Sequence, residues 1–164
     1  MNVRWNTGIP APKIRVKYTE IFVPTPGKPV EFILHGAWVD SLTVHWIGRS
    51  VPCLGDDCPS EVHAANAEAR HFIAALHRVE KRQVVLSFSD KGLEDLAALR
   101  REHHCLLNLA VEVWRTLGKG GRHHVRTISV TASEAEKRHH TDPKPLLEAI
   151  WRRAAEKIVR EGRP

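Results

Sequence analysis

Apolar residues recur at every second position in several stretches of this chain, which is the pattern of a strand with one buried face. The first two stretches are 30–38 and 42–46, and Asp40 and Ser41 between them are typical turn residues. A second pair of stretches, 72–76 and 84–88, is joined by the polar residues 80–82. Each pair is predicted to form a β-hairpin.

A third hairpin is predicted further along the chain. Residues 107–113 alternate between apolar and other side chains, and residues 125–131 follow a glycine turn at 118–121. Lys119 and Arg122 lie in or next to this turn, so its tip is expected to be basic. A glycine-rich tip lets the backbone approach a phosphate closely, although a plain flexible turn gives the same sequence pattern.

Three segments have helical features. Ser89 or Asp90 can cap a helix that carries apolar residues at 93, 96 and 97 and ends by His104. Asp142 can cap a helix with Pro143 at its first position, whose apolar stripe runs along 147–158 and whose other face is basic. The Ala-rich segment 61–70 predicts a short helix between strands.

The order of these elements predicts a mainly β domain with two or three helices. Residues 1–29 are a Pro-rich extended arm with one edge strand at 14–23, residues 30–131 form the domain with a Cys-containing insertion at 52–70, and residues 132–164 are a linker and a basic amphipathic helix. One helix that follows the early strands and precedes a closing hairpin is the layout of a small β-barrel such as the OB-fold. Other Greek-key or SH3-like barrels have a similar layout.

Between 30 and 131, this element order and the Cys-containing insertion resemble the small OB-fold single-stranded DNA-binding proteins of phages and bacteria. Some members of that group carry a metal-binding insertion between strands. The resemblance implies an OB-like barrel that binds single-stranded DNA without sequence preference.

The charge of the chain agrees with a polyanionic partner. Lys and Arg number 25 against 19 Asp and Glu, which gives a formal net charge of +6 and a pI near 9.5. Clustered cations gain free energy by displacing the counterions of a nucleic acid. No apolar run approaches the roughly 20 residues that span a bilayer, so a cytoplasmic protein without a membrane partner is expected.

Trp114 lies on the polar side of its predicted strand, where a solvent-facing residue is expected. An exposed indole beside cations is what base stacking requires. The predicted nucleic-acid-binding residues are Trp114, Arg115, Lys119, Arg122 and Arg126, with Trp38, Trp46 and Phe72 as alternative stacking residues. The competing interpretation is that the C-terminal helix covers Trp114 and packs Trp151 against it.

Three cysteines form an odd set, which favours reduced thiols or a metal site over a disulfide framework. The pattern Cys53-x4-Cys58-x4-His63, with His71 further on, predicts a structural zinc site. The fourth ligand stays open among His71, Cys105, His103 and Asp57. A loop with two free thiols and no metal is the alternative.

The leading hypothesis is a non-catalytic, single-stranded nucleic-acid-binding protein of replication, recombination or a mobile element, with DNA favoured over RNA. The sequence contains no motif of a hydrolase, a metalloprotease or a dinucleotide-binding enzyme. A second hypothesis is an assembly subunit that binds protein partners through its arm and C-terminal helix. A metal-dependent nuclease built on the His and Cys residues is the third.

Overall fold

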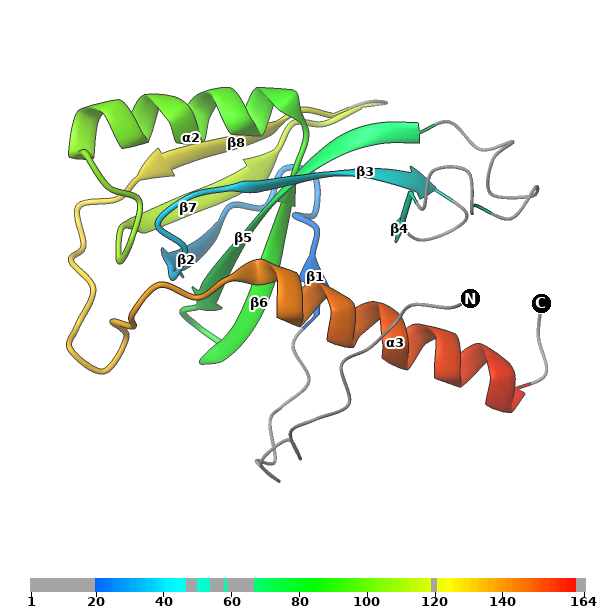
Figure 1. The fold of residues 1–164 in the computed structure, drawn as a ribbon. Helices are drawn as coiled ribbons and strands as arrows, with labels where there is room; N and C mark the ends of the chain where they lie inside the picture. Colours follow the sequence, from blue (N-terminus) through cyan, green and yellow to red (C-terminus); the bar gives the residue numbers. More distant parts are fainter. Residues whose placement is uncertain (1–19, 47–49, 54–57, 59–66, 119–120, 162–164) are drawn as a thin grey trace.

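The computed structural model describes residues 20–46, 50–53, 58, 67–118 and 121–161, with side chains described up to residue 153. These residues form a mixed sheet of eight strands and two helices (Figure 1). In chain order they are β1 (Ile21–Phe22), β2 (Val30–Leu34), β3 (Asp40–Trp46), β4 (Ser50–Pro52), β5 (Ala67–His77), β6 (Arg82–Phe88), α2 (Asp90–His103), β7 (Ala110–Arg115), β8 (His123–Thr127) and α3 (Pro143–Glu161).

The sheet is built around β5, its longest strand. Its path runs β1-β6-β5-β2-β7-β8, with β3 paired to β5 and β4 paired to β3. All pairs are antiparallel except β1 with β6. The predicted mainly β class is confirmed. Among the described residues no pairing joins β8 back to β1 or β6, so the sheet is open where a closed barrel was expected.

The predicted hairpin between the first two long strands is wrong. β2 and β3 do not pair with each other, because both pair with the same edge of β5: Leu34 lies opposite Ala75, and Asp40 lies opposite Phe72. Asp40 and the following Ser41 are therefore ladder residues of β3 and not a turn. The chain turns instead around Gly36, where a Cβ atom would lie 2.5 Å from Cγ1 of Ile73.

The Ala-rich segment is not helical over its described part. Residues 67–70 are the start of β5 and pair with β3, and residues 61–66 lie outside the described residues. The predicted edge strand at 14–23 is described only from residue 20, where β1 pairs with β6. In contrast, the β5–β6 hairpin and both later helices form where the pattern places them. The β7–β8 hairpin forms around the predicted turn, but its strands span 110–115 and 123–127 and not the predicted 107–113 and 125–131.

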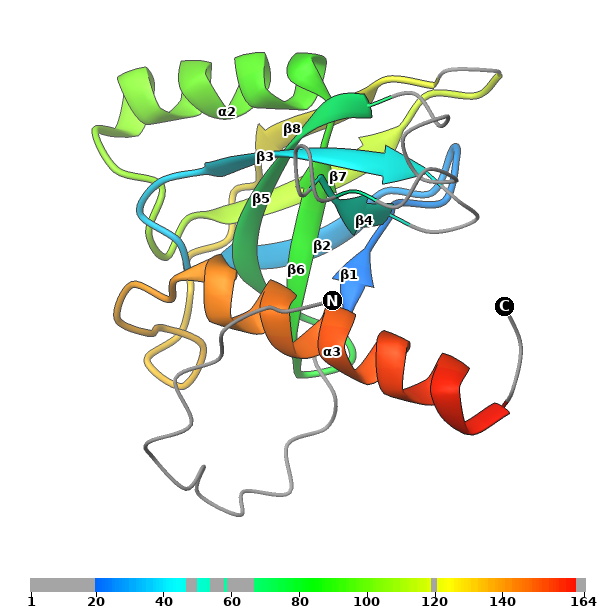
Figure 2. The same ribbon diagram turned by 45° about the vertical axis from the view of Figure 1, so that its right-hand side comes forward.

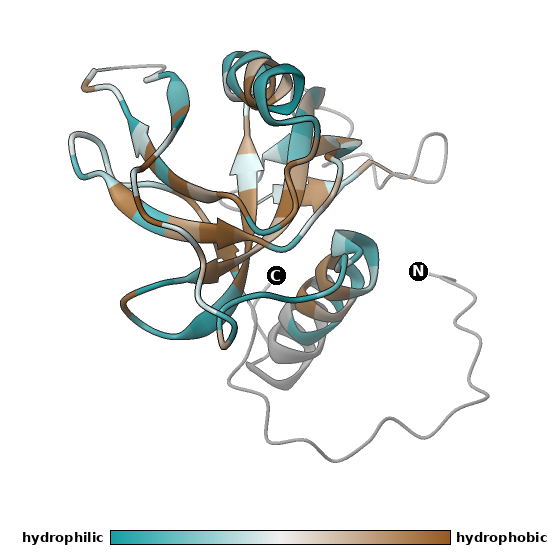
Figure 3. Cartoon of the chain, turned by 90° about the vertical axis from the view of Figure 1, so that its left-hand side faces the viewer, coloured by the Kyte–Doolittle hydropathy of each residue, from teal (hydrophilic) through white to brown (hydrophobic). Residues whose placement is uncertain are grey.

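Two hydrophobic clusters lie on opposite faces of the sheet. Leu96 and Leu99 of α2 pack on one face with side chains such as Phe32 and Val111, whereas Leu147 of α3 packs on the other face. Figure 2 shows the two helices on different sides of the strands, and Figure 3 shows hydrophobic stretches along the strands that they cover. Within the described residues, no helix is both long and apolar enough to cross a membrane.

Of the two predicted helix caps, the one at α3 forms through a side chain and the one at α2 does not. Asp142 accepts a hydrogen bond at 2.9 Å from the N–H of Lys144, so it caps α3 as predicted, with Pro143 at the first position. Helix α2 begins after Ser89, whose side chain makes no capping hydrogen bond, so the predicted side-chain cap does not form there; the helix ends at His103, and the next residue, His104, has a positive φ of 64°.

Glu136 ties the segment before α3 to the β5–β6 hairpin. Its buried carboxylate accepts hydrogen bonds from the backbone and side chain of Ser133 and lies 3.1 Å from Nε of Arg78 and 3.0 Å from Nζ of Lys81. These donors lower the pKa of Glu136 to about 2, with the Ser133 N–H contributing most. The carboxylate is thus held ionised inside the protein.

We expect Glu136→Gln to lower the free energy of unfolding at pH 7 by about 1–3 kcal/mol, because buried charge-assisted hydrogen bonds are lost. Since the pKa of Glu136 in the folded protein lies below its ordinary value of 4.5, its contribution is complete above pH 4.5 and disappears as the pH falls toward 2. Urea unfolding of both proteins between pH 2.5 and 7 measures this. Glu134→Gln, at an exposed residue, is the control, and a constant difference between Glu136→Gln and the wild type at all pH values would contradict the assignment.

Candidate nucleic-acid interface and metal centre

The β3–β4 hairpin brings a histidine and two cysteines together. His45 lies opposite Val51 in the hairpin, and the N–H of Cys53 donates to the carbonyl of Thr43 at 2.9 Å. Cys58 also lies beside this hairpin. One possible ligand atom from each of His45, Cys53 and Cys58 lies within 4.8 Å of the other two. His45 and Cys58 are buried, and Cys53 is half-buried.

We call His45, Cys53 and Cys58 the metal group, and two of the distances between their donor atoms are close to those of tetrahedral coordination. The two sulfurs are 3.8 Å apart, and Sγ of Cys58 is 3.7 Å from Nε2 of His45. With metal–sulfur bonds of about 2.3 Å and a metal–nitrogen bond of about 2.0 Å, a tetrahedral ion places two sulfurs about 3.8 Å apart and a sulfur and a nitrogen about 3.5 Å apart. A disulfide, by contrast, requires about 2.05 Å between the sulfurs. The three residues therefore form a candidate metal site.

His71, which the sequence suggested as a ligand, is not part of the metal group. Its Nδ1 lies 2.6 Å from Oγ of Ser41 and its Nε2 lies 2.8 Å from Oδ1 of Asp90, so both ring nitrogens already have partners. These contacts join β3, β5 and the first turn of α2. Among the described residues, the histidine that accompanies the two cysteines is therefore His45 and not His71.

The other suggested ligands also differ in position. Cys105 and His103 lie at the far end of α2, where Cys105 is exposed, and neither belongs to the metal group. His63 and Asp57 lie outside the described residues. His45 was missed because the strand pattern explained it as one more residue of 42–46. The signal that could have found it is a histidine in the strand that leads directly into the cysteine loop.

Trp114 lies on the sheet face opposite the α2 core, as the alternation predicts. It is half-buried and pairs across the strands with His124, whose ring stacks on the indole at 5.2 Å with an angle of 19°. The guanidinium of Arg126 lies 5.1 Å from the centre of the indole and also forms an ion pair with Glu112 at 2.5 Å. A cation is thus fixed beside a partly open aromatic ring.

The C-terminal helix does not bring Trp151 against Trp114. Trp151 packs edge-on against Phe72 at 6.4 Å, and its Nε1–H donates to the carbonyl of Ser50 at 3.2 Å. Helix α3 therefore lies over β5 and β6. Figures 1 and 2 show the β7–β8 hairpin on the other side of the sheet's strands, away from α3.

The remaining predicted contact residues are in different environments. Arg122 is exposed on the β7–β8 hairpin and Arg115 is half-buried at the end of β7, while Lys119 lies outside the described residues. Trp46 is 61% exposed at the end of β3, close in sequence to the metal group. Phe72 is fully buried, so it is not available to stack a base. Trp38 lies between β2 and β3 against His140.

The β7–β8 hairpin depends on Gly121. The N–H of Thr116 donates to the carbonyl of Arg122 at 3.0 Å, and the N–H of Arg122 donates to the Thr116 hydroxyl at 2.9 Å. A Cβ atom at Gly121 would lie 2.3 Å from the carbonyl oxygen of Thr116. Only glycine permits this close approach, which sets the positions of Arg115 and Arg122 on the two sides of the turn.

Helix α2 supplies a partner for the outer edge of the same hairpin. Oδ2 of Asp95 accepts the N–H of Val125 at 3.1 Å and lies 3.4 Å from Nδ1 of His124. A carboxylate of the helix therefore occupies a position at which a neighbouring strand would otherwise accept a hydrogen bond from β8.

His123 is buried at the start of β8, with 4% of its surface exposed. Burial, and then the charges of Arg70, Arg115 and His124, lower its pKa to about 4. The imidazole is therefore neutral at pH 7. The charge of Arg70 reaches this ring from β5, only three residues after Ala67, which pairs with His45. The hairpin and the metal group thus lie toward the same end of the sheet, as Figures 1 and 2 also show.

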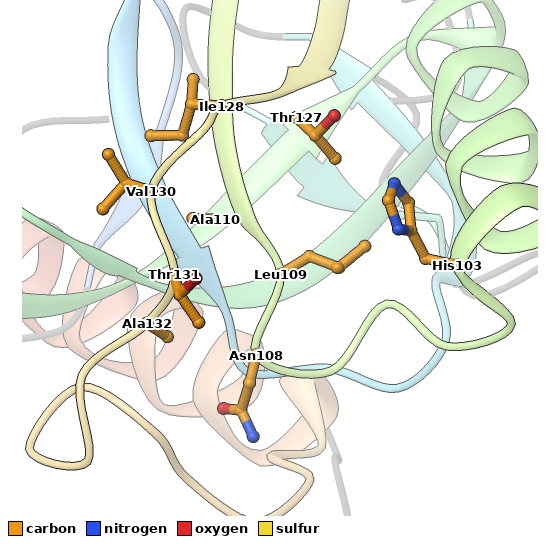
Figure 4. A pocket seen from close by; sticks show the side chains of 9 residues that line it. All are labelled: His103, Asn108, Leu109, Ala110, Thr127, Ile128, Val130, Thr131 and Ala132. Carbon is orange, nitrogen blue, oxygen red and sulfur yellow. The ribbon is translucent and has the colours of Figure 1, made fainter.

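A cavity lies at the other end of the β7–β8 pair. It has a volume of about 210 Å³ and is lined by His103, Asn108, Leu109, Ala110, Thr127, Ile128, Val130, Thr131 and Ala132 (Figure 4). Its lining is mostly apolar or neutral, with His103 on the α2 side. None of the predicted nucleic-acid contacts lines it.

Fold and site together define a mainly β domain with a candidate metal centre and a basic, aromatic hairpin at one end of its sheet. Comparisons of the chain with protein-family models, with curated proteins and with solved structures give no significant match.

The buried neutral His123 predicts a loss of stability in mild acid. Because its pKa in the folded protein lies below its ordinary value of 6.5, the unfolded chain takes up a proton that the folded protein does not. The contribution is complete above pH 6.5 and is lost as the pH falls toward 4, by about 2 kcal/mol at pH 4.5. Urea unfolding at pH 7, 5.5 and 4.5 should show a smaller pH dependence for His123→Gln than for the wild type. The exposed His139→Gln should behave like the wild type, and equal slopes for all three proteins would refute the prediction.

Proposed function

We propose that this protein binds single-stranded DNA through the β7–β8 hairpin and that a structural zinc ion holds the neighbouring cysteine loop. The observation that carries the proposal is the half-buried indole of Trp114 with the guanidinium of Arg126 at 5.1 Å. Every base has a π-face, so such a ring takes bases of any identity. The expected binding is therefore largely independent of sequence.

The charge around Trp114 supports this proposal. Arg115, Arg122 and Arg126 all lie on the same hairpin, and Arg122 and the side chain of Arg126 are exposed. Among the described residues, Glu112 is the only carboxylate that pairs with one of these three arginines, and its partner is Arg126. Arg126 can exchange this partner for a phosphate, while Arg122 meets the strand from the tip of the hairpin.

The strand pairing supports the OB-like interpretation. Together, β2 and β3 act as one bent strand that pairs first with β7 and then with β5, and α2 connects β6 to β7. An OB-fold is a partly open five-stranded barrel that binds oligonucleotides with the loops between its first two and its last two strands. In this chain the corresponding connections are the cysteine loop and the β7–β8 hairpin.

A structural role suits the proposed zinc ion. Thiolate and imidazole donors favour zinc, and structural zinc sites are closed to solvent whereas catalytic ones keep an open position. His45 and Cys58 are buried, which favours a closed site and disfavours a nuclease centre. Zinc bound there would fix the end of β3 relative to the start of β5, beside the hairpin.

Protein purified without chelator should contain about one zinc per chain. Cys53→Ser and His45→Ala should each lose most of it, and chelation should lower the Tm of the wild type, because metal binding contributes directly to folding stability. Metal analysis and thermal unfolding measure both effects. Cys105→Ser, an exposed cysteine outside the metal group, should retain the zinc, and equal zinc content in Cys53→Ser and Cys105→Ser would rule out the site.

Labelled oligo-dT should bind with an affinity that falls linearly on a log–log plot against salt concentration. Trp114→Ala should weaken binding by about 1–3 kcal/mol, the value of one stacked base. Fluorescence anisotropy at several salt concentrations gives both quantities. Trp38→Ala tests the alternative stacking residue, whose indole is 47% exposed elsewhere in the fold, and should weaken binding less than Trp114→Ala.

Three results would argue against the proposal. Equal losses in Trp114→Ala and Trp38→Ala would mean that the hairpin is not the binding surface. Tighter binding to oligo-U than to oligo-dT would make RNA the ligand. A defined oligomer without salt-sensitive binding to either strand would favour the assembly-subunit alternative.

A further inference from the structure

Within the part of the chain that the structure describes, two buried hydrogen-bond donors in the last ladder pair before the β7–β8 turn have no acceptor. Arg115 and His123 are directly opposite each other in the ladder, so their side chains are on the same face of the sheet. Nε of Arg115 and Nε2 of His123 are both buried, and neither has a hydrogen-bond partner among the described residues. Buried polar groups in proteins are nearly always paired, so two neighbouring exceptions need a physical reason.

The hydrogen bond at the other ring nitrogen shows that Nε2 of His123 is a donor. Nδ1 accepts the N–H of Ser89 at 3.3 Å, so it carries no proton. A neutral imidazole has one N–H, which must then be on Nε2. The ring is neutral at pH 7 because its pKa is lowered to about 4. Both unpartnered atoms, Nε2 of His123 and Nε of Arg115, therefore offer a proton to the same region.

The electrostatic surroundings favour an anion as the acceptor. The charges of Arg70, Arg115 and His124 all lower the pKa of His123, so the region has a positive potential. Arg70 pairs with Glu68 at 2.7 Å and His124 lies 3.4 Å from Asp95. No described carboxylate pairs with Arg115. Arg115 is half-buried, so part of the side chain is open to solvent although its Nε is buried.

We propose that Arg115 and His123 bind one phosphate group of the nucleic-acid strand that the hairpin takes. This assignment rests on the proposed function. A phosphate accepts several hydrogen bonds at once, so its oxygens can take the N–H groups of both side chains. Trp114 is the residue before Arg115 and is on the opposite face of the sheet, so the nucleic-acid strand would cross the edge of the hairpin near its turn, from a stacked base to this phosphate.

The experiment compares the salt dependence of oligo-dT binding in Arg115→Gln with that in Arg101→Gln. The two variants lose the same charge, but Arg101 is exposed in the last turn of α2, away from the hairpin. Because one phosphate contact contributes about 0.7 to the slope of log K against log salt for a single strand, Arg115→Gln should reduce the slope by about 0.7. Arg115→Lys keeps the charge, and should keep the slope while binding more weakly.

A second measurement on the wild-type protein needs no variant. The side-chain ¹⁵N signals of His123 should shift when inorganic phosphate is added and should shift further with oligo-dT. Equal slopes for Arg115→Gln and Arg101→Gln, in a protein that binds oligo-dT, would overturn the phosphate site and leave the proposed function intact. If oligo-dT does not bind at all, the proposed function fails, and the response of His123 to inorganic phosphate then decides whether the anion site itself exists.

Discussion

One edge of β5 is shared by two strands, and the rest of the fold depends on this arrangement. β3 pairs with residues 67–72 of that edge and β2 with residues 75–77, while β6 covers the opposite edge. The β2–β3 segment must therefore bend around β5, and Gly36 permits this because Ile73 occupies the space that a Cβ atom would need. On one side of the bend, β2 also pairs with β7. On the other side, β3 contains His45 of the metal group.

The same arrangement connects the two candidate sites. His45 is held opposite Ala67 at the start of β5, and the charge of Arg70, three residues later, acts on His123 of the hairpin. A metal ion bound by His45, Cys53 and Cys58 would therefore fix the start of β5. Arg70, whose charge acts on His123 of the hairpin, lies in this part of β5. Under the proposed function, such a metal would support the hairpin and would not itself contact the nucleic acid.

Alternation along the chain predicts which residues form strands, but not which strands become neighbours. The β5–β6 and β7–β8 hairpins were predicted because their partners are close in sequence, and Asp142 revealed the start of α3 by local chemistry. β2 and β3 were wrongly paired because their common partner begins over 20 residues after β3 ends. The helical propensity of Ala67 and its neighbours was overridden by the ladder with β3. His45 was overlooked because its role as a candidate ligand arises only when the cysteine loop folds back.

The carboxylate of Asp95 at the edge of β8 has a consequence for self-association. An outermost strand with unsatisfied N–H groups is a template onto which a second molecule can add its own strand, the usual beginning of edge-to-edge aggregation. By taking the Val125 N–H, Asp95 gives this strand an intramolecular partner and places a negative charge where an incoming backbone would approach. The last strand of the sheet therefore offers one N–H fewer to a strand of another molecule, and an approaching backbone carbonyl would meet a carboxylate at that position.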